Sequence, residues 1–366
     1  MKVAVIGAGI VGSSVAYRLS EGGAHVVLID GAKPGSGTTS TSFAWVNANN
    51  KLPRNYFELN AAGMREHERL RDELGGDWLY STGNLIWAAD EEQKNLESRV
   101  ERLRSWSYAA EMLLASTVNE NLEPGAAFPD PAVRIAHFAE ESWVEAPALT
   151  RTLVESASRN GAHEHFGNAV RGIEVKGEGV VLQLEDDDPV HADVAVNATG
   201  AKAASVAEMV GRELPLDVFP GLLVRVAVPG EPLRHLMHTP RINVRPDGPG
   251  YVLLHHDSID ERLTEDFAGT EDPLCAELLE RARLVLPALE EAEIVEARFG
   301  MRPVPADGHS CVGALSEIPG YYEAVTHSGV TLGPLIGRLL AREILTGDVD
   351  PLIAPFRPDR YPLAQT

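Results

Sequence analysis

Three glycines near the N-terminus, Gly7, Gly9 and Gly12, have the spacing of a turn that binds phosphate. The first permits a tight turn, the second lets the backbone approach a pyrophosphate, and the third allows close packing of a helix on a strand. Asp30 follows 18 residues after Gly12 and can accept hydrogen bonds from ribose hydroxyl groups. Because its charge disfavours a 2′-phosphate, the pattern indicates a dinucleotide other than NADP.

The elements around these residues must hold them in place. The β-branched run at 2–6 predicts a buried parallel strand, and the apolar spacing at 10–21 predicts a helix. A second strand is predicted at 25–30, which completes a strand–helix–strand unit. The sequence GSGTTS at 35–40 then supplies hydroxyl and backbone donors beside the pyrophosphate.

The rest of the chain alternates between helical and extended patterns. Helices are predicted at 54–75, 90–115, 147–161, 272–286 and 333–346. Strands are predicted at 162–166, 168–175, 178–185, 193–198, 216–228, 249–256 and 321–326. This order predicts an α/β chain (an α+β composite), with a Rossmann-like nucleotide-binding domain and an inserted antiparallel-sheet domain. We expect the former at 1–85, 142–215 and 296–366, and the latter at 86–141 and 216–295.

Composition narrows the possible partners. The 366 residues include 54 acidic and 32 basic ones, which gives a net charge of −22. Such a chain repels phosphate backbones and anionic lipid, so neither nucleic acid nor a membrane surface is an expected partner. No membrane span is expected, because no run of 18 apolar residues occurs. The two cysteines, Cys275 and Cys311, predict no disulfide framework and favour a cytoplasmic location.

The chain resembles the D-amino-acid oxidase superfamily of flavoproteins, in its glycine oxidase and sarcosine oxidase branch. Four blocks carry the resemblance, in order and over nearly the whole length. They are VAVIGAGIVGSSVAYRL with Asp30 and GSGTTS; ESWVEAPALTRTLVESASRNGAHEHFGNAVRGIEV; VNATGA; and FGMRPVPADGHSCVG followed by EAVTHSGVTLGPLIGRLLAREI. The first block is shared by many nucleotide-binding proteins, whereas the last is much more specific.

The resemblance implies FAD as the cofactor. It implies non-covalent binding, because Gly300 stands where some relatives hold a linking cysteine. Residues 329–332 match a turn whose N–H groups face the N1–C2 carbonyl edge of the flavin, before a helix near Gly333. The cofactor-binding positions carried over are Gly7, Gly9, Ile10, Val11, Gly12, Asp30, Gly31, Thr38, Thr39, Ser40, Val170, Ala198, Thr199, Gly200, Arg302, Gly329, Val330, Thr331 and Leu332.

Three residues are candidates for the substrate side: Arg302, His256 and Trp45. Arg302, expected in a rigid turn before a strand, matches the arginine that pairs with the substrate carboxylate in relatives acting on amino acids. His256 matches a region where some relatives hold an active-site histidine, but the adjacent His255 leaves the register open. Trp45 either shapes the pocket or packs in the core. A tyrosine found in some relatives is absent near Ile242.

Other polar residues leave alternatives open. Arg241, Asn243 and Arg245 would suit a larger or dianionic substrate if they lined the pocket, although a surface role is equally compatible with the sequence. The pairs His163/His165 and His235/His238 lack an accompanying cysteine or carboxylate pattern, so no metal site is expected.

The leading hypothesis is an FAD-dependent oxidase of an amino acid or secondary amine. Hydride transfer from the substrate C–H to flavin N5 would give an imine, and O2 would reoxidise the flavin to give H2O2. One alternative is a dehydrogenase that passes electrons to a quinone or a carrier. Another is a flavin-binding protein without turnover. The sequence leaves the substrate and the oligomeric state open.

Overall fold

The computed structural model describes residues 1–177, 179–264 and 266–361. The first residue of the strand predicted at 178–185, and the end of the segment predicted at 296–366, lie outside the described residues. The chain forms two compact units. The first comprises Met1–Leu79, Val144–Phe219 and Met301–Thr366, and the second comprises Tyr80–Trp143 and Pro220–Gly300. The nucleotide-binding and substrate-binding roles expected for the two parts of the chain remain predictions.

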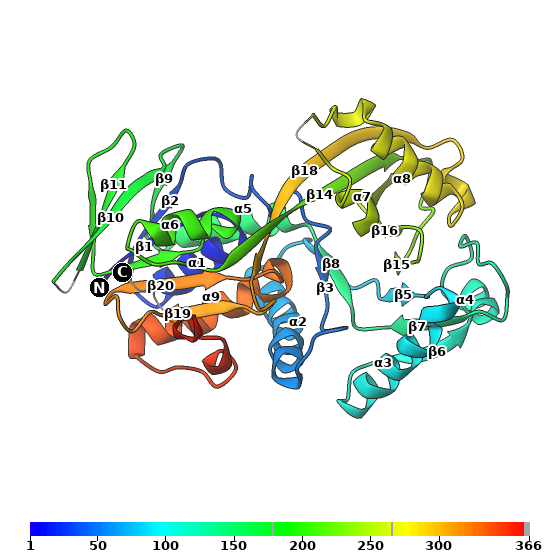
Figure 1. The fold of residues 1–366 in the computed structure, drawn as a ribbon, viewed down its shortest axis with the longest axis horizontal. Helices are drawn as coiled ribbons and strands as arrows, with labels where there is room; N and C mark the ends of the chain where they lie inside the picture. The colour runs from blue at the N-terminus through cyan, green and yellow to red at the C-terminus, as the bar shows by residue number, and fades with distance from the viewer. Residues whose placement is uncertain (178, 265, 362–366) are drawn as a thin grey trace. The chain divides into compact units, whose positions relative to one another are not determined.

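A six-stranded sheet runs through the first unit in the order β19-β20-β13-β1-β2-β9 (Figure 1). The pairs from β20 to β9 are parallel, and β19 is antiparallel to β20. The first two strands have the predicted bounds and are apolar because both faces of the sheet are covered. The bounds are β1 Lys2–Ile6, β2 His25–Asp30, β9 His163–Phe166, β13 Val194–Asn197, β19 Cys311–Ala314 and β20 Tyr321–Val325.

Helices cover one face of this sheet, as Figure 1 shows. Val3 and Val5 of β1 share a core with the apolar side chains of these helices. The approach of α1 to α9 is close, since a Cβ at Gly337 would lie 2.6 Å from Ser14. The helices are α1 (Ile10–Glu21), α2 (Arg54–Leu74), α5 (Ala146–Arg159) and α9 (Gly329–Thr346).

A three-stranded antiparallel sheet covers the other face. Ala4 and Ile6, which alternate with Val3 and Val5 along β1, share their core with this second sheet and with Val206 of α6. The elements are β10 (Val170–Lys176), β11 (Gly179–Leu184), β12 (Val190–Ala192) and α6 (Ala203–Glu208).

The second unit contains most of an eight-stranded sheet in the order β18-β14-β17-β16-β15-β5-β7-β6. The predicted antiparallel pairing of strands near 216–228 and 249–256 is confirmed by β14 and β17. One pair, β15 with β5, is parallel. The bounds are β5 Asn84–Ile86, β6 Glu111–Leu114, β7 Arg134–Phe138, β14 Leu216–Ala227, β15 Leu236–His238, β16 Asn243–Pro246, β17 Tyr251–His255 and β18 Glu293–Pro305.

Apolar side chains from one face of this sheet form a separate core with α8. Val224, Val244 and Leu254 contribute to it, together with Leu278 and Ala282 of the helix. The helices of this unit are α3 (Gln93–Ser105), α4 (Ala115–Asn121), α7 (Asp257–Asp260) and α8 (Pro273–Arg283).

Short elements complete the described chain. A small sheet has the order β3-β8-β4, with bounds Trp45–Val46, Ser142–Val144 and Leu79–Tyr80. Single 3₁₀ turns occur at Asp90–Glu92, Gly200–Lys202, Gly269–Glu271, Pro287–Leu289, Ala354–Phe356 and Pro358–Arg360.

Three predicted elements differ from the structure. The helix predicted at 90–115 ends at Ser105, because Ser107 has a φ of +61° and the following β6 pairs with β7. The helix predicted at 333–346 begins at Gly329, four residues earlier. Arg302 lies inside β18 and not in a turn, because its strand continues to Pro305.

Two further observations concern the cysteines and the helices. Cys275 and Cys311 are both buried and unbridged. Among the described residues, no helix is both long and apolar enough to cross a membrane.

Candidate functional site

The loop between β1 and α1 requires glycine at two of the predicted positions. Gly7 has a φ of +102°, and a Cβ there would lie 2.5 Å from the carbonyl oxygen of Ala198. A Cβ at Gly12 would lie 1.9 Å from the carbonyl oxygen of Gly7. Ile10 and Val11 begin α1, where N–H groups lack intrahelical partners and favour anions. The structure therefore brings this loop together with the end of β13.

Asp30 holds the loop from the end of β2. Its Oδ2 accepts a 2.7 Å hydrogen bond from the N–H of Ala8, and its Oδ1 accepts a 2.8 Å bond from the N–H of Ala32. A carboxylate has about four acceptor positions, so these two bonds leave capacity for ribose hydroxyl groups. Asp30 can therefore shape the loop and bind a nucleotide at the same time.

The other residues predicted for the nucleotide follow nearby strands of the first unit. A Cβ at Gly31 would lie 3.1 Å from Ala169, the residue directly before Val170. Thr199 and Gly200 follow β13, and Gly200 has a φ of +59°. The segments that directly follow β2 and β13 therefore carry small side chains, and these two strands lie on either side of β1.

The segment after β2 bonds to two distant parts of the first unit. Thr39 accepts a 3.1 Å hydrogen bond at Oγ1 from the N–H of Ile10, at the start of α1. Thr38 donates a 2.6 Å hydrogen bond from its hydroxyl to the carbonyl oxygen of Met301. The hydroxyl of Ser40 bonds back to the backbone of its own segment. The segment therefore connects the glycine loop to β18.

The predicted flavin-facing turn at 329–332 is the first turn of α9, with Ser328 as N-cap. Thr331 donates a 3.3 Å hydrogen bond from Oγ1 to the carbonyl oxygen of Trp45. The N–H of Asn47 donates a 3.3 Å bond to the same Oγ1. The positive end of α9 thus lies against the 45–47 backbone, where the sequence predicted a role only for Trp45.

Arg302 lies in β18, half-buried, between the exposed Met301 and the buried Pro303. The carbonyl oxygen of the preceding residue, Met301, accepts the hydrogen bond from Thr38. The turn expected at Arg302 comes later in the chain, where Gly308 has a φ of +75° and its N–H bonds to Pro305. The prolines of β18 restrict the backbone conformation of the strand that carries the Arg302 side chain.

Three polar residues form a row across adjacent strands of the second unit. His238 on β15 pairs with Asn243 on β16, and Asn243 pairs with His255 on β17. Directly paired residues lie on the same face of a sheet. The alternate residues Val244 and Leu254 point into the α8 core. The polar row therefore occupies the face opposite that core.

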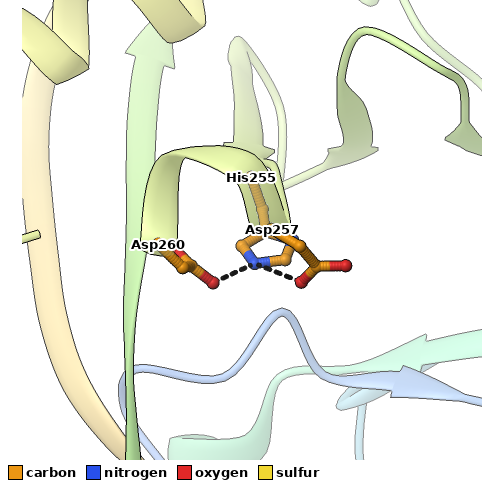
Figure 2. A group of neighbouring side chains, drawn as sticks. All are labelled: His255, Asp257 and Asp260. Carbon is orange, nitrogen blue, oxygen red and sulfur yellow. Dashed lines mark hydrogen bonds and ion pairs between the residues drawn. The ribbon is translucent and has the colours of Figure 1, made fainter. Parts of the chain in front are cut away.

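His255 forms a dyad with a buried carboxylate (Figure 2). Its Nε2 lies 2.9 Å from Oδ2 of Asp260 and 3.7 Å from Oδ1 of the exposed Asp257. Asp260 is itself held at Oδ1 by the N–H of Leu222, at 2.8 Å. A neutral imidazole that donates from Nε2 keeps Nδ1 as its acceptor. His256 instead forms the N-cap of α7, so His255 and not His256 belongs to the polar row.

His238 is oriented by a second buried chain of hydrogen bonds. Its Nδ1 lies 2.9 Å from Oδ1 of Asn84, whose Nδ2 donates to Glu141 at 2.8 Å. Since the amide oxygen accepts, Nδ1 carries the proton in His238. Burial, assisted by the nearby charges of His255 and Arg99, lowers the pKa of His238 to about 3. This imidazole is therefore neutral at physiological pH.

A model of the DAO family, described as FAD dependent oxidoreductase, matches residues 2–343, nearly the whole chain. The chain belongs to this family. The protein is therefore an FAD-dependent oxidoreductase, as the resemblance in its sequence implied.

Individual relatives match the chain over nearly its full length. The chain is 27% identical to the uncharacterized oxidoreductase YurR of Bacillus subtilis, covering 97% of both chains. It is 26% identical to glycine oxidase of Bacillus licheniformis, covering 94% of this chain and 93% of the relative. The crystal structure of glycine oxidase from Geobacillus kaustophilus superposes with a TM-score of 0.88 at 24% identity, covering 98% of both chains. This likeness confirms the predicted α/β fold with its Rossmann-like part.

The first unit contains buried polar atoms that fit FAD. Asn49 is 2% exposed, and neither Nδ2 nor Oδ1 of its amide has a hydrogen-bond partner among the described residues. The Oδ1 of the buried Asn47 likewise has no hydrogen-bond partner among the described residues. Native proteins pair nearly all such atoms, so a bound polar group is the natural partner. Asn49 was not predicted from the sequence, where its only signal is the unusual run NANN after the serine- and threonine-rich segment.

A pocket of about 290 Å³ continues from this loop. Lys51 donates a 3.1 Å hydrogen bond from Nζ to Oγ of Ser328, the N-cap of α9. The lysine therefore adds a positive charge close to the positive end of that helix. The lining residues are Asn50, Lys51, Leu52, Tyr56, Asp307, Gly308, His309 and His327.

The remaining substrate candidates have structural surroundings of different kinds. Ile242, where a tyrosine is absent, is buried in the α8 core and does not face the polar row. Arg241 is exposed. Arg245 is buried, pairs with Asp247 at 2.8 Å and stacks on Trp143 at 4.1 Å. Arg245, one of the residues whose role the sequence left open, thus already has a carboxylate partner.

Proposed function

We propose that this FAD-dependent oxidoreductase is an oxidase of an amino acid or of a secondary amine that carries a carboxylate. The observation that carries the proposal is the position of Arg302 near the proline-containing end of β18. It directly follows Met301, whose carbonyl oxygen accepts the hydrogen bond from Thr38. A guanidinium binds a carboxylate through two parallel hydrogen bonds, which fixes the orientation of the substrate. The glycine oxidases of Bacillus licheniformis and Pseudomonas aeruginosa are relatives whose names indicate a substrate of this class.

FAD, when bound, accepts the hydride that the substrate carbon loses, and the resulting imine is hydrolysed by water. The cofactor is held non-covalently in this proposal, because Gly300 replaces a linking cysteine. The residues proposed to bind the pyrophosphate and ribose are those of the glycine loop and Asp30. The first turn of α9 would stabilise negative charge on the reduced ring.

The reacting amine must be neutral before its carbon can lose hydride, and a substrate that binds as the neutral amine meets this requirement without a base from the protein. Trp45, whose backbone carbonyl accepts a hydrogen bond from Thr331, is proposed to shape the pocket.

The test is anaerobic reduction of the purified yellow protein by glycine, N-methylglycine, iminodiacetate and the D- and L-forms of common amino acids. Bleaching by at least one carboxylate-bearing amine, but not by the matching amine without a carboxylate, is the expected result. If no member of the panel bleaches the flavin, the proposal is wrong.

The electron acceptor is tested separately. H2O2 formed in air at the rate of substrate consumption supports an oxidase. Rapid reduction of a quinone or dye under nitrogen with slow reaction in air would instead support the dehydrogenase alternative.

The two buried, unbridged cysteines support a reducing, cytoplasmic location.

A further inference from the structure

The loop from Asn47 to Lys51 is attached at both ends to the start of α9. At one end the N–H of Asn47 donates to Oγ1 of Thr331, and at the other end Lys51 donates to Oγ of Ser328. Tyr56 also places its hydroxyl 3.4 Å from the Ser328 hydroxyl. The loop is thus bonded to the helix terminus at both ends, and Asn49 is its middle residue.

Asn49 is the unexplained residue of this loop. Its amide is buried, yet both polar atoms lack a hydrogen-bond partner among the residues that the structure describes. Leaving one buried donor or acceptor unpaired costs about 1–3 kcal/mol, and here two such atoms belong to one side chain. A leucine of similar size would avoid this cost, so a bound polar group is the natural partner of the amide.

The flavin ring offers the complementary group. Its pyrimidine half carries an N–H donor, N3, between two carbonyl acceptors, C2 and C4. A side-chain amide has one acceptor and two donors, so it can accept from N3–H while donating to a neighbouring carbonyl. We propose that Asn49 binds this imide edge of FAD through such a paired hydrogen bond. The inference rests on FAD binding alone and holds for any substrate.

Asn47 and Lys51 complete the environment of the edge. The Oδ1 of Asn47 supplies a further unpaired acceptor in the same loop, within the part of the chain that the structure describes. Lys51 and the terminus of α9 place positive charge beside the loop, which favours the electron-rich, reduced ring. The loop therefore combines recognition of the imide with stabilisation of negative charge.

The experiment reconstitutes the apoprotein with FAD and with 3-methyl-FAD, in which a methyl group replaces the N3 proton. Wild-type protein should bind 3-methyl-FAD about 10-fold more weakly than FAD, as measured by quenching of flavin fluorescence. Asn49→Leu should bind FAD about 10-fold more weakly than wild type and should bind the two cofactors equally. Asn160→Leu, the same change at an exposed position, should keep the wild-type difference.

The melting temperature of the apoprotein separates this role of Asn49 from simple misfolding of the variant. Asn49→Leu should raise the melting temperature of the apoprotein, because it removes two unpaired polar atoms from a buried site. If Asn49→Leu does not fold, Asn49→Asp serves instead: it keeps an acceptor and should still bind FAD more tightly than 3-methyl-FAD. The proposal is overturned if wild type binds both cofactors equally, or if the preference for FAD persists in Asn49→Leu.

Discussion

The hydroxyl of Thr38 donates a 2.6 Å hydrogen bond to the carbonyl oxygen of Met301, a residue 263 positions further along the chain. Thr38 follows the strand that ends in Asp30, and Met301 directly precedes Arg302. The bond therefore joins the segment proposed to lie beside the FAD pyrophosphate to the strand that carries the proposed carboxylate anchor. Both residues belong to the first unit, so their relationship does not depend on the second one.

Replacing Arg302 should weaken substrate binding. Arg302→Ala should lower the rate of flavin reduction at low substrate by about 100-fold, because the substrate carboxylate loses a charged, two-point partner. Arg302→Lys should recover part of this loss, since it restores charge but not the planar fork. Stopped-flow reduction under nitrogen measures both. Arg241→Ala, which removes an exposed arginine, is the control and should behave as wild type.

Gly12→Ala should abolish FAD binding. The added Cβ would lie 1.9 Å from the carbonyl oxygen of Gly7, so the glycine loop must move. The flavin absorbance per mole of purified protein measures the effect. Gly37→Ala is a matched control, because a Cβ there meets no described atom within 4 Å. Equal flavin content in the two variants would contradict the role of the loop.

The stability of the fold should fall in mild acid because of His67. Burial lowers the pKa of His67 from 6.5 to about 4, while its Nε2 bonds the carbonyl of Val330 at 2.7 Å. Between these two pH values the unfolded chain binds a proton that the folded chain does not. The free energy of unfolding should thus decrease by about 1.4 kcal/mol per pH unit, or about 3 kcal/mol in all.

Urea unfolding at pH 7 and pH 4.5 tests this dependence. His67→Gln, which can still donate to Val330 but has no proton to gain, should show a smaller decrease than wild type. His25→Gln, at an exposed position, should keep the wild-type decrease. An unchanged pH dependence in His67→Gln would remove this residue as the cause.

Much of the first unit was predictable from local patterns. The apolar runs before Gly7 and before Asp30 have the same bounds in the structure, because strands buried on both faces leave a continuous apolar signal. The helix between them was predictable from its apolar spacing and its terminal glycines. The family was also predictable, since its blocks lie in order along the chain.

The tertiary structure alone shows how the candidate residues are held. Arg302 lies in a strand and not in a turn because β18 continues to Pro305. His255 and not His256 joins the polar row, since strand pairing decides which of two adjacent side chains lies on which face. Asn49 became a candidate only through its burial without partners among the described residues. Residue types and spacings therefore determined which cofactor chemistry the chain supports. Contacts between distant segments, which leave no local signal, decided how the candidate side chains are held.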